Sequence, residues 1–461
     1  MSATRAVRVV TTGARLVTGA AVAVACVVGV VAAIHAPWPE LSQSPAQVEV
    51  TPLPGDSVLV CNGDLRAIGR DSSDPLGMRS AGSPRLTQGS TSALPTASAI
   101  RVADVIDAGD ATALTGVVAD RIAPLIAATE SVSSAAEDLS GFAALPCGTP
   151  RLESWLVGGS VDTGSSDIVV LSNASEVAAT VTLSVYGESR SARTVIVPAS
   201  TQVSLALTSI AAGNSAPVVQ VTSDGASVRA VLQSSVVRTL DPAGMDLQDS
   251  VAGPQQNPVI AGVQSFAADG DDADMTVLRL LSPQSAAEAR VVVRETGSSS
   301  VANEFSVSLA ADLPADVSLS GLAPGSYTVE IDADAPVVSG VRQQDGLGAG
   351  TDFAWVTPAP EIDADVLFAV PEGPSATLHL MNTTDADLRV TVASADGEGQ
   401  PREVTVGARN SVEVPVDAEG SYLLQPEGTV HAAVTMAAGG ALAGWPIQPG
   451  AGAAQSITVY P

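Results

Sequence analysis

The feature that most constrains the fold is a pattern of short apolar strands that recurs three times from Ser154 onward. Alternating apolar and polar residues bounded by Gly, Pro, Asn and Asp are typical of half-buried strands. Each recurrence opens with two such runs, at Ile168–Asn173 and Ala179–Tyr186, at Met275–Pro283 and Ala289–Val293, and at Ala376–Asn382 and Leu388–Val392. The spacing of about one hundred residues suits a seven-strand sandwich. The sequence therefore predicts an all-β chain of three tandem antiparallel β-sandwich (Ig-like) domains, which together would form an extended rod.

Gly/Pro-rich stretches mark the predicted domain boundaries. Residues 241–258 and 346–360 interrupt the strand pattern, because such clusters break ladders and set turns. The predicted sandwich domains are 151–250, 251–350 and 351–461.

The preceding segment, residues 37–150, is predicted to be mixed and partly irregular. Within it, residues 64–98 are predicted to form an irregular loop because they are rich in Ser, Gly and Pro. Ala111–Ala128 and Val132–Leu145 fit either helices or strands broken at Pro124.

The N-terminus carries an uncharged apolar run, Leu16–Ile34, preceded by Arg5, Arg8 and Arg15. Nineteen residues in a helix can span the hydrocarbon layer of a membrane, and the arginines keep the N-terminus cytoplasmic. We expect residues 1–36 to form a cytoplasmic tail and transmembrane signal anchor, which makes this a single-pass membrane protein with its bulk outside the cytoplasm. The alternative is a signal peptide cut near Val31–Ala33, which would release a secreted protein.

The strongly negative net charge of the chain limits which classes of molecule it is expected to bind. The chain has 49 acidic and 21 basic residues, a formal net charge of −28, and every acid follows the apolar run. A negative field repels nucleic acid, so we expect no nucleic-acid partner.

Two cysteines lie beyond the apolar run, Cys61 and Cys147. An isolated pair outside the cytoplasm most often forms one structural disulfide, and we predict that bond here. A redox or metal site is the alternative, but neither cysteine belongs to a CxxC motif or has a histidine near it in sequence. Cys26 falls within the apolar run and is interpreted as a thiol buried in the membrane.

The sequence offers no catalytic constellation. Its three histidines, His35, His379 and His431, accompany no GxSxG, HExxH, GxGxxG or P-loop motif, so each is interpreted as a solvated or cross-strand residue. An acidic run is a weak candidate for Ca²⁺ through Asp269, Asp271, Asp272 and Asp274. A solvated acidic loop is favoured because the spacing is not that of an EF-hand. We predict no catalytic residue, no metal site and no cofactor.

Three tryptophans, Trp155, Trp355 and Trp445, lie at predicted domain boundaries. They are the candidate interaction residues. Packing between domains is favoured over sugar stacking, because a carbohydrate platform needs several exposed rings close together.

The runs Leu139–Cys147, Ser154–Gly159 and Phe353–Trp355, with the paired cysteines, carry a resemblance to a known group. The chain resembles an uncharacterised actinobacterial family of exported or membrane-anchored proteins that contain a domain of unknown function and a WxVGG motif. Members are often encoded beside a large membrane glycosyltransferase. The resemblance implies an envelope role and supplies no catalytic residue.

Three functions fit these observations. The first is a non-enzymatic, membrane-anchored scaffold or interaction protein of the cell envelope, with an envelope protein or glycan as partner. The second is a glycan-binding accessory to envelope polysaccharide synthesis. The third, a hydrolase with two carboxylates, would need two acids about 5–10 Å apart in a cleft.

Overall fold

The computed structural model describes residues 3–35, 48–50, 54–267, 273–397, 399–450 and 457–459. Strands dominate these residues, and all but two of their named strand pairings are antiparallel. The chain divides into two compact units, residues 1–52 with 455–461, and residues 53–454. The prediction of a mostly β, antiparallel chain after an apolar N-terminal helix is confirmed.

The smaller unit contains the apolar helix α1 (Ala3–His35). Its exposed stretch Leu16–Ile34 is long and apolar enough to cross a membrane, and it is the one such stretch among the described residues. A signal sequence has the same properties, so retention of α1 stays a prediction. The unit also contains β1 (Val48–Val50), which pairs with β36 (Ile457–Val459).

The larger unit contains three pairs of sheets with the same strand order. One sheet of each pair holds the first, sixth, third and fourth strands of the repeat. These sheets are β11 (Glu153–Leu156), β16 (Val218–Asp224), β13 (Ala179–Tyr186) and β14 (Ser191–Val197); β19 (Val259–Ser265), β24 (Gly325–Ala333), β21 (Ala287–Glu295) and β22 (Val301–Leu309); and β28 (Val366–Val370), β33 (Gly420–Pro426), β30 (Leu388–Ser394) and β31 (Arg402–Val406).

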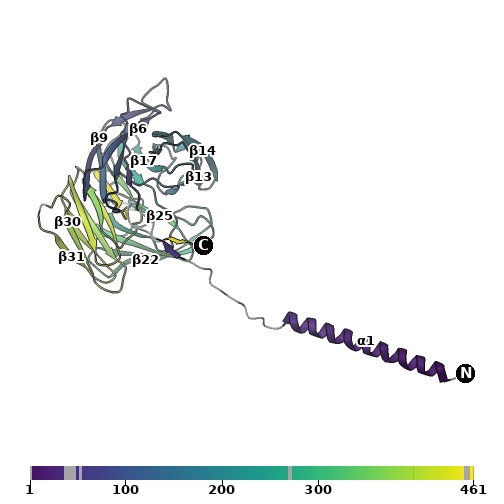
Figure 1. Ribbon diagram of the computed structural model, residues 1–461. Helices are drawn as coiled ribbons and strands as arrows, with labels where there is room; N and C mark the ends of the chain where they lie inside the picture. The colour runs from purple at the N-terminus through teal and green to yellow at the C-terminus, as the bar shows by residue number, and fades with distance from the viewer. Residues whose placement is uncertain are drawn as a thin grey trace. The chain divides into compact units, whose positions relative to one another are not determined.

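The other sheet of each pair holds the eighth, seventh, second and fifth strands. These sheets contain β18 (Asp241–Asp249), β17 (Arg229–Arg238), β12 (Ile168–Asn173) and β15 (Thr201–Ala206); β26 (Phe353–Val356), β25 (Val338–Gln344), β20 (Thr276–Leu281) and β23 (Ala315–Ser318); and β35 (Ala441–Pro446), β34 (Val430–Ala438), β29 (Ala376–Asn382) and β32 (Asn410–Val416). The short strand β27 (Glu361–Ile362) adds to β34, and the short helix α2 (Thr208–Ala211) follows β15. Figure 1 labels strands from all three pairs: β13, β14 and β17 of the first, β22 and β25 of the second, and β30 and β31 of the third. The repeat seen in the sequence is therefore a repeat of topology.

Each sheet pair encloses one apolar core. In the first pair, Val169 and Leu171 of β12 share a cluster with Val181 and Leu183 of β13, and all four are fully buried. Alternate residues of β13 are buried because successive side chains of a strand point to opposite faces of its sheet. Each such side chain contributes about 1.5–3 kcal/mol when it leaves water.

The sequence predicted a partly irregular N-terminal segment, and this prediction was wrong: the segment consists largely of strands. Residues 64–98, predicted to be a loop, contain three whole strands and the start of a fourth. The stretches Ala111–Ala128 and Val132–Leu145, predicted to be either helices or strands, form strands. The segment contains β2 (Ser57–Val60), β3 (Leu65–Ile68), β4 (Met78–Gly82), β5 (Arg85–Ser90), β6 (Thr96–Val102), β7 (Val105–Ile106), β8 (Ala111–Gly116), β9 (Ile126–Ala135) and β10 (Ser140–Pro146). These strands are rich in Ala, Ser and Gly, which have little intrinsic strand preference, so their pairing partners determine the conformation.

The segment also does not stand apart from the first sheet pair. Strand β6 pairs in parallel with β15, so that β6, β8 and β2 extend the sheet of β18, β17, β12 and β15 to seven strands. Buried Arg66 adds a second connection, donating from Nε to Ser204 Oγ at 3.0 Å and from Nη2 to Gln202 Oε1. The segment and the first sheet pair thus share one sheet.

The Gly/Pro-rich stretches predicted as linkers contain the eighth strands β18 and β26. These strands, together with β10 and β35, pack around one buried carboxylate, that of Asp352. Its Oδ2 accepts hydrogen bonds from the N–H groups of Phe142 and Leu442, both at 2.9 Å, and its Oδ1 accepts one from Met245 at 2.9 Å. We call β10, β18, β26, β35 and Asp352 the hub. It joins all four parts of the larger unit into one compact body, so the expectation of an extended rod was wrong.

Two glycines make room for this carboxylate. Gly141 and Gly244 have φ values of 137° and 112°, which residues with side chains rarely adopt. A Cβ added to Gly244 would lie 2.7 Å from the Phe353 ring and 2.9 Å from Asp352 Cα. The hub therefore requires glycine at these positions.

Asn173 and Asn382 end equivalent strands and close equivalent turns. Asn382 Nδ2 donates to the carbonyls of Ala386, Val406 and Gly407 at 2.7–3.1 Å, and its Oδ1 accepts from the Thr384 N–H at 2.9 Å. Asn173 makes the matching set of bonds in the first sheet pair. Both side chains therefore form turns, as asparagine commonly does by bonding to nearby backbone groups.

Replacing Asn382 with alanine should lower the free energy of unfolding by about 2 kcal/mol, because it leaves buried carbonyl groups without donors. Urea unfolding of the purified full chain measures the change. The control is Asn257→Ala, since Asn257 is exposed and its side chain donates to exposed Asp332. An equal loss in both variants would contradict a special role for the Asn382 bonds.

Candidate functional site

A small polar pocket lies between the first two sheet pairs. It is lined by Ser160, Asp167, Ser234, Arg238, Arg342, Gln344 and Trp355, among others. The two arginines and Gln344 come from β17 and β25, on which residues two apart share a face. Its cavity volume is about 30 Å³, well below the roughly 150 Å³ of a protein cavity that holds a benzene ring.

The run Trp155–Gly159 forms one side of this junction. The Trp155 ring packs 5.2 Å from the Tyr186 ring, in a cluster that includes Leu281 of the second pair. Gly158 lies against Trp355, since an added Cβ would be 3.0 Å from that ring. The motif residues therefore hold the two sheet pairs together.

Arg279 of β20 fixes this run to the second pair. Its Nη1 donates to the carbonyl groups of Val157 and Gly159 at 3.3 and 2.8 Å. Its Nε and Nη2 donate to the two carboxylate oxygens of Asp316 at 2.7 and 2.8 Å. This bidentate pair neutralises the Arg279 charge locally. The guanidinium carbon also lies 5.1 Å from the Trp355 ring centroid.

Arg238 and Arg342 have no such acidic partner among the described residues. Arg238 Nη2 donates to Gln344 Oε1 at 2.8 Å, and Arg342 Nη2 lies 3.5 Å from the Asp274 backbone carbonyl. Burial lowers the pKa of both guanidinium groups, and Arg279 lowers that of Arg342 further. Arginine nevertheless stays protonated near neutral pH, so this side of the pocket is positively charged.

Two buried acids lie at the same junction. Asp167 Oδ2 accepts a hydrogen bond from the Ser160 N–H at 2.6 Å, and Asp246 Oδ2 accepts one from the Trp355 N–H at 2.8 Å. Burial raises the pKa of each carboxyl group to about 7. It raises the pKa of Asp352 in the hub to about 8, although the N–H donors oppose the change.

The two histidines of the third sheet pair are buried cross-strand residues, as predicted. His379 Nε2 lies 2.8 Å from Thr435 Oγ1, and burial lowers the pKa of this imidazole to about 4. His431 Nδ1 lies 2.8 Å from the Ala359 carbonyl, and burial lowers its pKa as well. His35 is the last residue of helix α1.

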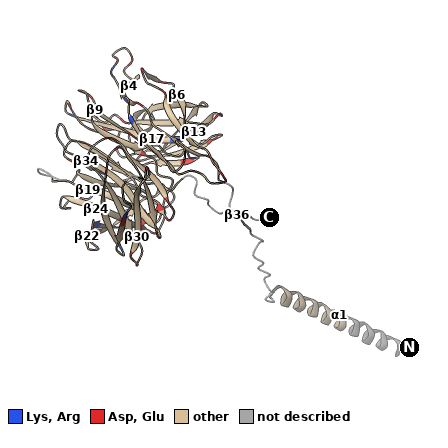
Figure 2. Cartoon of the chain, turned by 60° about the vertical axis from the view of Figure 1, so that its left-hand side comes forward, with Lys and Arg blue, Asp and Glu red and all other residues tan. Residues whose placement is uncertain are grey.

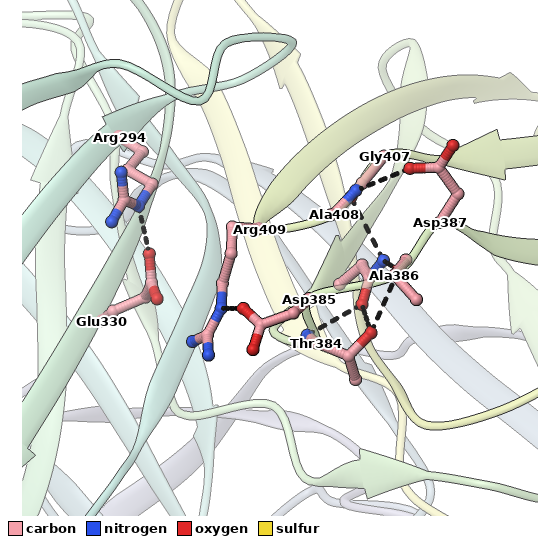
Figure 3. Close-up of polar contacts among 10 residues, drawn as sticks. Arg294, Glu330, Thr384, Asp385, Ala386, Asp387, Gly407, Ala408 and Arg409 are labelled. Carbon is pink, nitrogen blue, oxygen red and sulfur yellow. Dashed lines mark hydrogen bonds and ion pairs between the residues drawn. The ribbon is translucent and has the colours of Figure 1, made fainter.

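Strands of the second sheet pair and turns of the third carry two ion pairs (Figure 3). Arg294 Nε donates to Glu330 at 2.6 Å and Arg409 Nε to Asp385 at 2.9 Å. The Arg409–Asp385 pair is exposed and the Arg294–Glu330 pair is half-buried. Exposed ion pairs contribute little to stability, and we assign neither pair a functional role.

The shifted pKa values of these buried acids and histidines allow a prediction of how the stability of the protein depends on pH. A carboxyl group whose pKa is raised on folding binds its proton more tightly in the native state, so stability falls as pH rises toward the native pKa. The lowered histidine pKa values have the opposite effect, but only below about pH 6.5. We therefore expect the melting temperature to fall by several degrees from pH 6.5 to pH 8.5. Asp246→Asn should flatten this slope, and an unchanged slope in that variant would contradict the assignment.

The three candidate tryptophans are buried, with 2–4% of their surfaces exposed. Trp155 and Trp355 lie between the first two sheet pairs, and Trp445 belongs to the core of the third. The structure brings Trp355 into the pocket but gathers no row of exposed rings from the three. Their predicted role as interaction residues remains untested.

The acidic run is only partly described. Asp269, Asp271 and Asp272 lie outside the described residues, and Asp274 is exposed. Calcium binding there stays a prediction.

The predicted disulfide between Cys61 and Cys147 is present. Both cysteines are buried beside Glu130, whose carboxylate accepts a hydrogen bond from the Asn62 N–H at 2.6 Å. Because the two sulfur atoms are bonded to each other, they are not free thiolates for a metal.

Sequence reasoning did not single out Arg238, Arg279 or Arg342. The sequence does predict that Ser234, Val236 and Arg238 share one face of a strand, because they are two residues apart. It does not predict that this face of β17 meets β25, because that contact depends on how separate sheet pairs pack.

Comparison with known proteins gives a family without an assigned activity. The model of a family of unknown function (DUF5719) matches residues 102–417, which is more than half of the chain. Among curated proteins, none matches the chain.

Proposed function

The chain belongs to this family of unknown function, and we propose that it is a non-enzymatic scaffold of the cell envelope. In this proposal α1 anchors the protein in the cell membrane, and three Ig-like β-sandwich domains lie outside the cytoplasm. The partner would be an envelope protein or glycan. The disulfide supports export, since such bonds persist outside the reducing cytoplasm.

The observation that carries the proposal is the hub. One carboxylate accepts backbone hydrogen bonds from three other parts of the chain, which fixes the sheet pairs relative to one another. A rigid body of this kind suits a protein that presents several surfaces at fixed positions. An enzyme that closes on its substrate would instead need parts that move.

The other candidates have less support. A glycan-binding accessory was suggested by the three tryptophans, whose rings are buried. A hydrolase would need two acids facing one cleft; Asp167 lines the pocket, but Asp246 is not among the residues that line it. Both acids also hold backbone N–H groups at the junction.

Crosslinking tests the scaffold role. The full chain, in its own membranes, would be crosslinked and purified, and co-purifying molecules compared with those from membranes that lack it. We expect one envelope protein or polymer to be enriched reproducibly. No enrichment above the control would contradict the proposal, and so would hydrolysis of a wall glycan by the purified chain.

A further inference from the structure

We propose that the pocket between the first two sheet pairs binds a small oxyanion, the carboxylate or phosphate group of a larger ligand, through Arg238 and Arg342. This inference does not depend on the scaffold role. It rests on the charges, unpartnered atoms and size of the pocket.

The first argument is charge. Arg238 and Arg342 line the pocket, and Arg279 lies near enough to act on Arg342 electrostatically. The chain has a formal net charge of −28, and Figure 2 shows basic positions as short, separate blue stretches. Asp316 neutralises Arg279 by a bidentate pair. Arg238 donates to a carboxamide oxygen and Arg342 lies near a backbone carbonyl. Asp274 attracts both guanidinium groups and Asp316 also attracts that of Arg342, but neither acid forms an ion pair with them in the described structure. The two guanidinium groups therefore keep the capacity to pair directly with an anion.

The second argument is unsatisfied hydrogen-bonding capacity. Arg238 Nη1 and Arg342 Nε are buried and have no hydrogen-bond partner among the described residues. A buried donor without a partner costs about 1–3 kcal/mol, and more when charged. Both residues line the same pocket, so one oxyanion there would accept from both. Guanidinium groups suit this task because their planar N–H groups match carboxylate and phosphate oxygens.

The acid that lines the pocket, Asp167, is compatible with a bound anion. One of its carboxylate oxygens already accepts a hydrogen bond from the Ser160 N–H. Because burial raises the pKa of Asp167 to about 7, this group carries a proton in a large share of molecules near neutral pH. A protonated Asp167 can donate to the ligand, and the Ser160 and Ser234 hydroxyl groups lie on the same lining.

Size limits what enters. About 30 Å³ admits one charged group and not a whole sugar or nucleotide. The remainder of the ligand would therefore extend into solvent.

Trp355 makes the pocket observable, because its ring lines it and should report binding by fluorescence. The full-length chain in detergent would be titrated with inorganic phosphate, acetate, glucuronate and, as a neutral control, glucose. We expect saturable binding of phosphate or of the two carboxylates, and none of glucose. The arm that responds identifies which oxyanion the pocket takes.

Variants tie the binding to the pocket. Arg342→Gln and Arg238→Gln should each weaken binding at least tenfold, whereas Arg193→Gln, at an exposed arginine of β14, should leave it unchanged. Arg238→Lys keeps the charge, and we expect a smaller loss. Thermal unfolding confirms that each variant is folded, and anions should raise the melting temperature of the unmodified chain. Absence of binding for every anion, or equal loss in Arg193→Gln, would overturn the proposal.

Discussion

Replacing Asp352 with alanine should lower the free energy of unfolding by at least about 3 kcal/mol. The substitution removes the acceptor of three buried backbone N–H groups, those of Phe142, Met245 and Leu442. A buried donor that loses its partner costs about 1–3 kcal/mol. The three donors come from three different parts of the chain, so the loss should also loosen the packing between sheet pairs. Urea unfolding measures the energy, and limited proteolysis measures the loosening.

Two variants make the test specific. Asp352→Asn keeps one oxygen acceptor but turns an amide donor toward the N–H groups, so we expect a loss smaller than that of alanine. Asp363→Ala is the matched control, because Asp363 is exposed. If Asp352→Ala were no less stable than Asp363→Ala, the hub would not be the feature that unites the larger unit.

The strands of the three sheet pairs were largely predictable, and the hub was not. Ile168–Asn173 and Ala376–Asn382 form strands with the predicted bounds. The first is a continuous apolar run and the second alternates in part, and each ends at a turn-forming asparagine. Asp352 lies in a Gly/Pro-rich stretch that looks like a linker. Its role depends on Phe142 and Leu442, which are 210 and 90 residues away in sequence, and no local pattern connects such distant positions.

The prediction for the N-terminal segment was wrong for a different reason. Strand β5, Arg85–Ser90, reads Arg-Leu-Thr-Gln-Gly-Ser and has little apolar alternation of its own. It becomes a strand through its pairing with β9, and β-propensity depends strongly on such context. The same limit applies to the pocket. The sequence allows Arg238 and Arg342 to be assigned to strands, but it does not predict that the two arginines line one pocket.

Removing the disulfide by changing Cys61 and Cys147 to serine should lower the free energy of unfolding by about 2–5 kcal/mol. The bond joins residues 86 positions apart and so restricts the unfolded chain over a long loop. It also ties the chain after β2 to the chain after β10, and thus to the hub. Urea unfolding of the full chain measures the loss, and limited proteolysis should show first cleavage in the N-terminal segment.

The remaining cysteine separates the bond from general effects of substitution. Cys26 is unpaired and lies in α1, so Cys26→Ser should leave the unfolding of the larger unit unchanged. A reducing agent should destabilise the unmodified chain as much as the double substitution does, and have no effect on the double variant. A double variant as stable as the parent would mean that the hydrogen bonds beside the bridge already fix this region. In the native state Arg229 donates to the carbonyl groups of Val60 and Pro146, next to both cysteines. Those bonds exist only after folding, whereas the disulfide also acts on the unfolded chain, so we expect the bridge to be needed.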